Sequence, residues 1–232
     1  MSGSNLLIKK KPQEWLKVTK NGLFVVPGNF FIDPNIASDM AVVTHAHADH
    51  ARSGHKKVIA TPETLEIMKV RFGNGFSQSP YGLEYGRKLA VNNVTIWLAP
   101  AGHVLGSSQI VIEHEGARVV VSGDYKRQRD PTCNPFEAVT CDVFITEATF
   151  GLPVFKHPKA QLEIKKLLNS IDLFTDRCHV VGAYALGKAQ RIISLLRESG
   201  YQQPIFIHGA LKKLCDLYVE HGVELGEIIT VP

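Results

Sequence analysis

The sequence predicts an α/β protein of 232 residues, and two patterns along the chain support this class. Over the first two thirds, short apolar runs are bounded by glycine, proline, asparagine or aspartate, as strands usually are. After about residue 153, helical spacing of apolar residues alternates with short apolar runs, which predicts parallel strand pairing. At 44% hydrophobic and 21% charged residues, the chain can bury a core, so wholesale disorder is excluded.

The first two thirds of the chain are predicted to be mainly β. A helix is expected after Thr61, because Pro62 suits its first position and Glu63 and Glu66 lie near its positive end. The dipeptide Glu115-Gly116 is typical of a hairpin turn between two of the strands. The predicted strands are 23–26, 30–32, 41–44, 58–60, 94–98, 109–112, 118–121 and 143–146.

The last third is predicted to alternate between helix and strand. Helical spacing covers 159–173, the region around 192–196, and 210–220. Strands are expected at 178–181 and 204–207. Neither an internal repeat nor a low-complexity linker interrupts the chain.

Positive charge is concentrated at the N-terminus. The chain has 26 Lys and Arg against 22 Asp and Glu, and residues 1–20 hold five lysines and one acid. The remaining residues therefore balance. We interpret residues 1–20 as a basic arm, which fits a polyanionic partner and also an ordinary solvated terminus.

The sequence favours a cytoplasmic protein. It lacks the apolar run of a signal peptide, and no stretch approaches the roughly 20 apolar residues of a membrane span. The four cysteines form no CxxC pair, so we expect reduced, mostly buried thiols and neither a disulfide framework nor a thiolate zinc site.

The strongest chemical signal is Thr44-His45-Ala46-His47-Ala48-Asp49-His50, directly after an apolar strand. Three imidazoles and a carboxylate in six residues are hard to explain by packing, because buried histidines cost desolvation. These side chains suit Zn²⁺, Mn²⁺ or Fe²⁺. His103 and Asp124 also follow predicted strands, so both could join the cluster at one sheet edge. Asp33 follows a strand as well, and we expect it to hold a histidine by its free N–H.

These motifs carry a family resemblance that covers about residues 22–210. His-x-His-x-Asp-His, then Gly-His, then Ser-Gly-Asp resembles the metallo-β-lactamase fold, an αββα sandwich. Segments 101–107, 122–126, 146–153 and 184–191 are similar to β-CASP and DNA cross-link repair nucleases, closest to bacterial ligase-associated DNA exonucleases. The resemblance therefore implies a metallo-β-lactamase core over 21–153 and an inserted α/β β-CASP-like segment over 154–232.

The resemblance also implies roles for individual residues. His45, His47 and His103 would bind one divalent metal ion, Asp49 and His50 a second, and Asp124 would bridge the two. Zinc and manganese are the expected metals. Glu147 matches an acidic position of these nucleases, so Asp49, Asp124 and Glu147 are the predicted catalytic residues. Tyr184, Gly187 and Lys188 match a segment that contacts the substrate phosphate at a helix start, where backbone N–H groups and a lysine suit an anion.

The sequence departs from the family pattern towards its end. Members usually continue for roughly another hundred residues and supply a last metal histidine, and nothing similar occurs here. We therefore expect an incomplete sandwich and a truncated β-CASP-like segment, or a second metal held with one ligand fewer.

The resemblance implies a metal-dependent hydrolase that cleaves phosphodiester bonds of DNA as a repair exonuclease. Nucleic acid is the expected partner, with DNA favoured over RNA, together with a DNA ligase or helicase repair system and no membrane. The alternatives are an RNA-processing β-CASP nuclease, a metallo-hydrolase of a small thioester or lactam, and an inactive fragment. The metal motif alone does not separate them.

Overall fold

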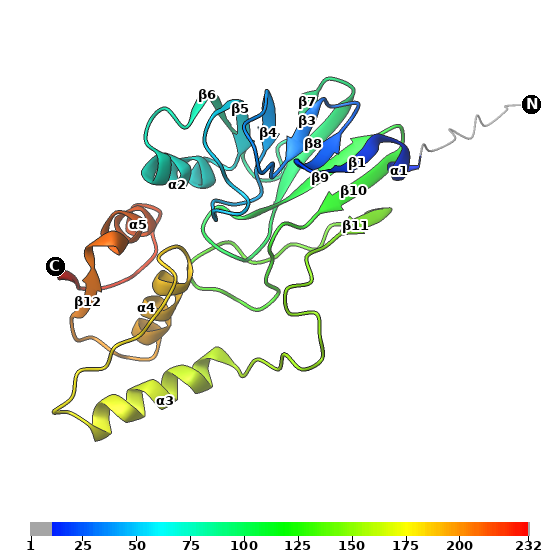
Figure 1. Ribbon diagram of the computed structural model, residues 1–232. Helices are drawn as coiled ribbons and strands as arrows, with labels where there is room; N and C mark the ends of the chain where they lie inside the picture. The colour runs from blue at the N-terminus through cyan, green and yellow to red at the C-terminus, as the bar shows by residue number, and fades with distance from the viewer. Residues whose placement is uncertain (1–10, 232) are drawn as a thin grey trace, which may run out of the picture. The chain divides into compact units, whose positions relative to one another are not determined.

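The computed structural model describes residues 11–231, which form a mixed α/β fold, so the predicted α/β class is confirmed (Figure 1). The chain divides into two compact units. The first runs to residue 129 and also includes 134–147, whereas the second comprises 130–133 and the part from 148 onward.

A six-stranded sheet forms the first layer of the first unit, in the order β1-β2-β3-β4-β5-β6. The first three strands pair antiparallel, and β3 through β6 pair parallel. The strand bounds are β1 Leu16–Thr19, β2 Gly22–Val25, β3 Phe30–Ile32, β4 Met40–Val42, β5 His55–Ala60 and β6 Ser77–Gly82.

A five-stranded sheet forms the second layer, in the order β11-β10-β9-β8-β7. Its pairs are antiparallel except β10 with β11. Glu115 and Gly116 have φ angles of 46° and 79°, the left-handed values that a tight hairpin between β9 and β10 requires. The strand bounds are β7 Leu89–Val91, β8 Val94–Pro100, β9 Ser108–His114, β10 Ala117–Val121 and β11 Val143–Ile145.

The two sheets of the first unit share one hydrophobic core. Phe30 and Ile59 of the first sheet and Ile96 and Ile110 of the second are completely buried in the same cluster. On the other face of the second sheet, Val111 and Val120 pack against the non-helical segment around residues 139–141. The core holds the ends of strands from both sheets in a fixed relation, and the loops that follow those strands carry the site described below.

The predicted basic arm does not extend over all of residues 1–20. Residues 1–10 lie outside the described residues. Helix α1 (Pro12–Trp15) and β1 follow, and Trp15 is only 3% exposed within the shared core. Burial of the large apolar indole of Trp15 is favourable in free energy compared with its exposure to water, so this segment packs against the core.

Helix α2 (Pro62–Phe72) begins where the sequence predicts. Thr61 caps it, because the Thr64 backbone N–H donates to Thr61 Oγ1 at 3.2 Å. Its buried residues include Ile67 and Met68, and it packs along β6.

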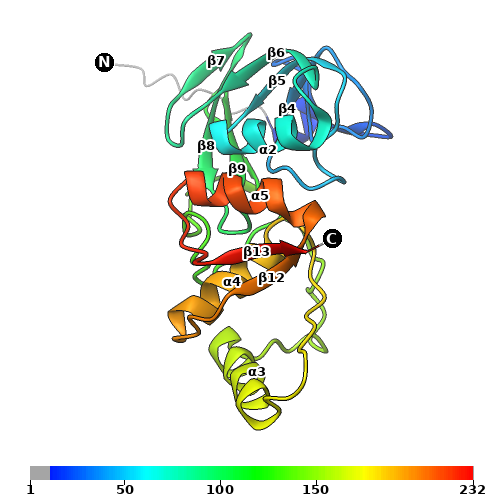
Figure 2. The ribbon, with the colours of Figure 1, turned by 90° about the vertical axis from the view of Figure 1, so that its left-hand side faces the viewer.

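The second unit contains three helices and a small parallel sheet (Figure 2). Strands β12 (Ile205–His208) and β13 (Ile228–Val231) pair parallel. The sequence predicts parallel pairing and the first of these strands, but not β13. Helix α5 packs on both strands. An ion pair of 3.0 Å between the buried Asp130 and the half-buried Arg191 holds the short segment 130–133 against α4. The helices are α3 Ala160–Leu173, α4 Lys188–Glu198 and α5 Gly209–Glu220.

Some predicted elements differ from the structure. The strand predicted at 178–181 does not form, and Val180 is 89% exposed, because no neighbouring strand among the described residues pairs with this apolar run. No disulfide joins the cysteines, but only Cys215 is buried, whereas Cys178 is exposed, so the expectation of mostly buried thiols is wrong.

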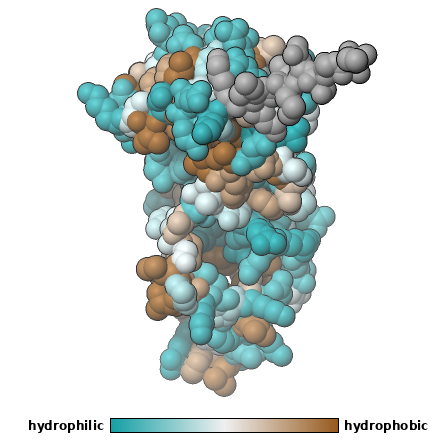
Figure 3. All heavy atoms as spheres, turned by 90° about the vertical axis from the view of Figure 1, so that its right-hand side faces the viewer, coloured by the Kyte–Doolittle hydropathy of each residue, from teal (hydrophilic) through white to brown (hydrophobic). Residues whose placement is uncertain are grey.

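Figure 3 shows apolar side chains among a hydrophilic surface on one face. In residues 11–231, no helix has the length and apolar character needed to cross a bilayer.

Candidate metal centre

The loops that follow four strands carry the candidate site. His45 comes shortly after β4, His103 shortly after β8, and Asp124 shortly after β10, while Asp33 directly follows β3. Strands β3 and β4 are parallel neighbours in one sheet, and β8 and β10 are separated by one strand in the other. Because the sheets share a core, these loop residues converge from both layers.

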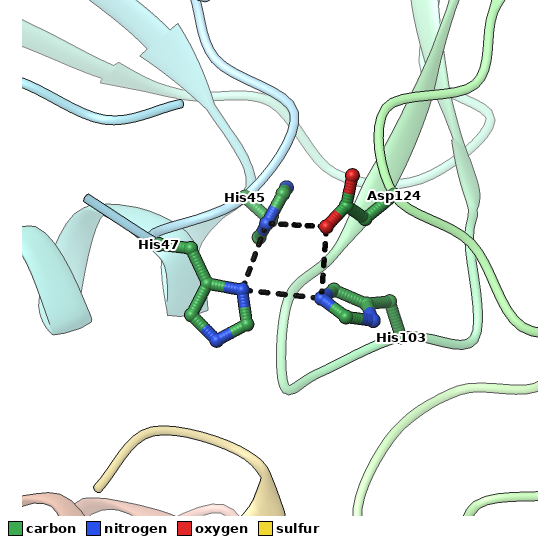
Figure 4. A group of neighbouring side chains, drawn as sticks. All are labelled: His45, His47, His103 and Asp124. Atoms are coloured by element: carbon green, nitrogen blue, oxygen red, sulfur yellow. Dashed lines mark hydrogen bonds and ion pairs between the residues drawn. The ribbon is translucent and has the colours of Figure 1, made fainter. Parts of the chain in front are cut away.

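Four side chains point at one another across the two layers (Figure 4). The ligand atoms of His45, His47, His103 and Asp124 all lie within 4.8 Å of one another. His47 Nδ1 lies 3.0 Å from His45 Nε2 and 3.1 Å from His103 Nε2. Asp124 Oδ2 lies 3.9 Å from His45 Nε2 and 3.6 Å from His103 Nε2. Three imidazole nitrogens and a carboxylate oxygen in this arrangement are a donor set that suits a divalent transition metal.

The second carboxylate oxygen of Asp124 faces a different group. Asp124 Oδ1 lies 3.4 Å from His50 Nε2, and Asp49 Oδ2 lies 3.7 Å from the same nitrogen. Asp49 is 78% exposed, whereas the His50 side chain is 20% exposed. Asp124 therefore stands between the cluster of three histidines and the Asp49–His50 pair, with one oxygen towards each.

Asp33 connects the first and the last residue of the histidine motif, Thr44 and His50. Its Oδ2 accepts from Thr44 Oγ1 at 2.6 Å and lies 2.7 Å from His50 Nδ1, while its Oδ1 accepts from the Thr44 backbone N–H at 2.8 Å. Asp33 has a φ of 43°, a left-handed conformation that aspartate tolerates better than most residues. The Asp33 carboxylate thus orients the His50 ring so that Nε2 points towards Asp124.

The pKa values of the histidines separate into two groups. Burial, reinforced by the neighbouring imidazoles, holds the pKa of His45 well below its ordinary value, and burial lowers the pKa of His103 to about 4. Burial also opposes the charge of His50, but hydrogen bonds to Asp124 and Asp33 outweigh it and raise the His50 pKa to about 10. The hydrogen bond with His50 in turn lowers the pKa of Asp124. His45 and His103 are therefore neutral at pH 7, as metal ligands must be.

These pKa directions predict that the metal-free protein is most stable near pH 6.5. His50 contributes stability below its ordinary pKa of 6.5, and this contribution is lost as pH rises towards about 10. On the acid side, His45 and His103 take up protons more readily when unfolded, so stability falls below pH 6.5. Urea unfolding of EDTA-treated protein between pH 5 and pH 9 checks this. A free energy of unfolding that still increases from pH 7 to pH 9 would contradict the His50 assignment, and His50→Gln should flatten the alkaline fall.

We expect Asp33→Asn to weaken metal binding about 10- to 100-fold, because residues that orient metal ligands typically contribute this much. The asparagine keeps the size of the side chain but removes the charge that orients His50. Competition with a chromophoric chelator measures the affinity. Asp39→Asn is a matched control, since the exposed Asp39 carboxylate pairs with the exposed Lys56 on the surface. Equal affinities of the two variants would show that Asp33 does not position His50.

Two glycines allow the ligand loops to approach closely. At Gly123 (φ 55°), a Cβ would lie 2.6 Å from Thr44 Cβ, and at Gly102 (φ 72°) it would lie 2.3 Å from the Lys126 carbonyl oxygen. Each glycine directly precedes a ligand, so the Gly-His and Ser-Gly-Asp motifs combine a ligand with the space it needs.

Sequence reasoning assigned no role to Arg71, Thr44 or Ser107. The Arg71 guanidinium on α2 donates to the Ala46 carbonyl inside the histidine motif. The Ser107 hydroxyl accepts from the His103 backbone N–H at 3.0 Å. For Thr44, the signal was its position directly before His45, and for Ser107 it was its place in segment 101–107. Arg71 carries no sequence signal, because folding alone brings it to the ligand loops.

Glu147 follows the end of β11, which pairs in parallel with β10. Its backbone N–H donates to Ser122 Oγ at 3.3 Å, two residues before Asp124. The structure therefore places the backbone of Glu147 beside the loop that carries Asp124. The bond involves the main chain, and the catalytic role of the Glu147 carboxylate stays a prediction.

Tyr184, Gly187 and Lys188 belong to the second unit, where α4 begins. Gly187 has a φ of 84° at the N-cap, and its N–H donates to Gln190 Oε1 at 2.8 Å. Lys188 Nζ lies 5.3 Å from the centre of the Tyr184 ring, and Tyr184 is 75% exposed. Since Gln190 already accepts from Gly187 and the Ala189 N–H donates to Tyr184 O, part of the expected anion-binding amide set is satisfied internally.

No protein-family model matches the chain. An uncharacterized protein in the lig 3' region of Acidianus ambivalens is 30% identical over 146 residues, which cover 61% of this chain and 99% of that protein. The probable DNA ligase of Opitutus terrae is 28% identical over 220 residues, 90% of this chain and 20% of that protein. Endoribonuclease ysh-1 of Neurospora crassa is 28% identical over 240 residues, 85% of this chain and 28% of that protein.

A solved structure supports the fold alone. The crystal structure of a protein of unknown function from Enterococcus faecalis V583 matches with a TM-score of 0.52 at 12% identity, covering 83% of this chain and 58% of that chain. This chain spans about a fifth of the ligase relative and under a third of the endoribonuclease relative.

The fold and the site define a mixed α/β protein whose histidine–aspartate cluster is suited to a divalent metal ion. The relatives narrow this class. Its homologues are of the ligase-associated and Ysh1 types, which are members of the β-CASP metallo-β-lactamase family, and their identity to this chain is modest.

Proposed function

We propose that this protein is a metal-dependent nuclease that hydrolyses phosphodiester bonds. The observation that carries the proposal is the convergence of His45, His47, His103 and Asp124 within 4.8 Å, with the second Asp124 oxygen turned to His50. We also propose that the two sheets with a shared core correspond to the β layers of the metallo-β-lactamase sandwich, and that residues from 154 onward are a β-CASP-like segment.

The proposed cofactors are two divalent metal ions, zinc or manganese. His45, His47 and His103 would hold one ion, Asp49 and His50 the other, and Asp124 would contact both. When bound, the ions would supply the Lewis acidity that lowers the pKa of water and offsets charge on phosphoryl oxygens. The donor set fits them, since both Asp124 oxygens face histidine nitrogens at 3.4 and 3.6 Å.

The residues of the chain have separate roles in this proposal. Asp124 orients the attacking water in line with the leaving oxygen, so that a new P–O bond forms as the scissile P–O bond breaks. Glu147 assists transfer of the proton from the water, and the leaving oxygen takes up a proton. Lys188 offsets negative charge on the phosphoryl oxygens, with Tyr184 and Gly187 in the same phosphate-binding segment.

We propose DNA as the preferred substrate and an exonuclease of repair as the biological role. The relatives named as a probable DNA ligase and as a protein in the lig 3' region support this choice. The proposal includes a DNA ligase or helicase repair system as partner and the cytoplasm as location. The second candidate is an RNA-processing nuclease, which the relative named Endoribonuclease ysh-1 favours.

Cleavage assays test both candidates. DNA and RNA labelled at the 5′ or 3′ end, single- and double-stranded, are incubated with the protein across a series of divalent metals. A chromogenic lactam and a thioester test for a small-molecule hydrolase. We expect DNA cleavage that the double variant Asp49→Ala/His50→Ala abolishes. Unchanged cleavage by that variant would contradict the metal mechanism, and hydrolysis of only the lactam or thioester would replace the nuclease proposal.

A further inference from the structure

A basic loop follows Asp124 directly. Residues 125–129 read Tyr-Lys-Arg-Gln-Arg, so three cationic side chains occur within five residues of the candidate metal ligand. Arg127 and Arg129 are exposed, and Lys126 is half-buried. We call residues 125–129 the basic loop. Outside the N-terminal twenty residues the chain balances its charges, so this density of cations is a local feature of the site.

The backbone of the basic loop is fixed against the loop that carries His103. The Lys126 N–H donates to the Ala101 carbonyl at 2.9 Å. The Lys126 carbonyl lies so close to Gly102 that a Cβ there would be 2.3 Å away. The start of the basic loop therefore has the same rigid support as His103, and its position relative to the ligands is set by the fold.

The side chain at the start of the basic loop packs inward. The Tyr125 ring lies 5.3 Å from the Phe136 ring and 6.1 Å from the Phe144 ring. Tyr125 thus fixes the loop to the first unit, while Arg127 and Arg129 are exposed residues. Because the backbone is ordered before any ligand arrives, little conformational entropy is lost when these cations meet an anion.

We propose that the basic loop is a phosphate-contact surface for nucleic acid, with Arg127 and Arg129 binding backbone phosphates next to the scissile one. The inference rests on the proposed nuclease function and deepens it. A guanidinium pairs bidentately with phosphate, and exposed cations that contact backbone phosphates account for sequence-independent affinity. The bound molecule is a polymer, because the exposed arginines would contact phosphates other than the scissile one.

The test compares two double variants with the same loss of charge. Arg127→Ala/Arg129→Ala changes the basic loop, and Lys159→Ala/Lys165→Ala removes two exposed lysines at the start of α3 and on it. Binding of fluorescent single-stranded DNA and RNA is measured by anisotropy in EDTA, where metal-dependent cleavage is absent, over a range of salt. We expect the loop variant to raise Kd about tenfold and to reduce the slope of log K against log salt by about 1.4, as for two lost phosphate contacts. The α3 variant should change neither by more than about twofold.

A second measurement separates this inference from the proposed function. Hydrolysis of bis(p-nitrophenyl) phosphate by metal-loaded protein should be equal in wild type and loop variant, because this small diester has no phosphate beside the scissile one. If the wild type hydrolyses no phosphodiester, the proposed function fails while the binding comparison still stands. Equal Kd and equal salt slope in both double variants would overturn the inference, and so would displacement by polyglutamate as effective as by an unlabelled oligonucleotide. If the double variant does not fold, Arg127→Gln and Arg129→Gln should each show about half the change in slope.

Discussion

Replacing Asp124 by asparagine is expected to lower kcat/KM for phosphodiester hydrolysis at least about 10³-fold. Loss of several kcal/mol of charge stabilisation corresponds to a change of this size. Asparagine keeps the shape of the side chain but removes the negative charge that faces His45, His103 and His50. The amount of bound metal should also fall, because the Asp124 carboxylate stands between the two proposed metal positions.

The control for this prediction makes the same exchange away from the site. Asp39→Asn removes one exposed carboxylate, which pairs with Lys56 at 2.7 Å, and should leave metal content and rate within about twofold of wild type. Steady-state kinetics with metal-loaded protein, combined with metal analysis, gives both readouts. An Asp124→Asn variant with full metal content and more than about a tenth of the wild-type rate would remove Asp124 from the mechanism. Such a variant would have lost less than about 1.4 kcal/mol of transition-state stabilisation.

Gly123→Ala is expected to destabilise the protein by about 2–4 kcal/mol and to abolish metal binding. About 1 kcal/mol comes from a side chain at φ 55°, and the rest from overpacking, because the added Cβ would lie 2.6 Å from Thr44 Cβ. Thr44 bonds Asp33 and directly precedes His45, so relief of the clash moves either the histidine motif or the Asp124 loop.

Gly200→Ala separates the two causes. Gly200 has a φ of 89° just after α4, where the Tyr201 N–H donates to the Leu196 carbonyl as in a left-handed helix cap, and an added Cβ there would meet nothing within 4 Å. It should cost only about 1 kcal/mol and leave metal binding unchanged. Urea unfolding and metal titration of both variants check the prediction. Equal destabilisation and equal metal affinity would show that the contact between Gly123 and Thr44 does not hold the site together.

Local signals explain which elements could be predicted from sequence. The helix start at Thr61 and the turn at Glu115-Gly116 depend on neighbouring residues, and both form as expected. Strand β6 (Ser77–Gly82) escaped prediction because it contains polar residues and a proline, and pairing with β5 alone makes it a strand. Conversely, the apolar run at 178–181 has strand composition but no strand partner among the described residues. Whether two distant segments pair cannot be predicted from the residues of either segment alone.

The same contrast between local sequence signals and contacts between distant segments applies to the candidate site. The rule that a ligand follows each strand brought His103 and Asp124 into the prediction, and the structure places both beside His45 and His47. Arg71 could not be found this way, because its bond to the Ala46 carbonyl depends on how α2 lies against the motif. The arginines of the basic loop were visible in the sequence. That the backbone of this loop is fixed beside the His103 loop follows only from the hydrogen bond of the Lys126 N–H to the Ala101 carbonyl in the structure.

The most direct test of the central claim is the metal content of the purified chain after loading with zinc or manganese and exhaustive dialysis. A divalent metal held by His45, His47, His103 and Asp124 predicts at least about one ion per chain, and about two if the Asp49–His50 pair also binds. The triple variant His45→Ala/His47→Ala/His103→Ala should retain none at the first position. A wild-type content well below one ion per chain, or an unchanged content in the triple variant, would contradict the account.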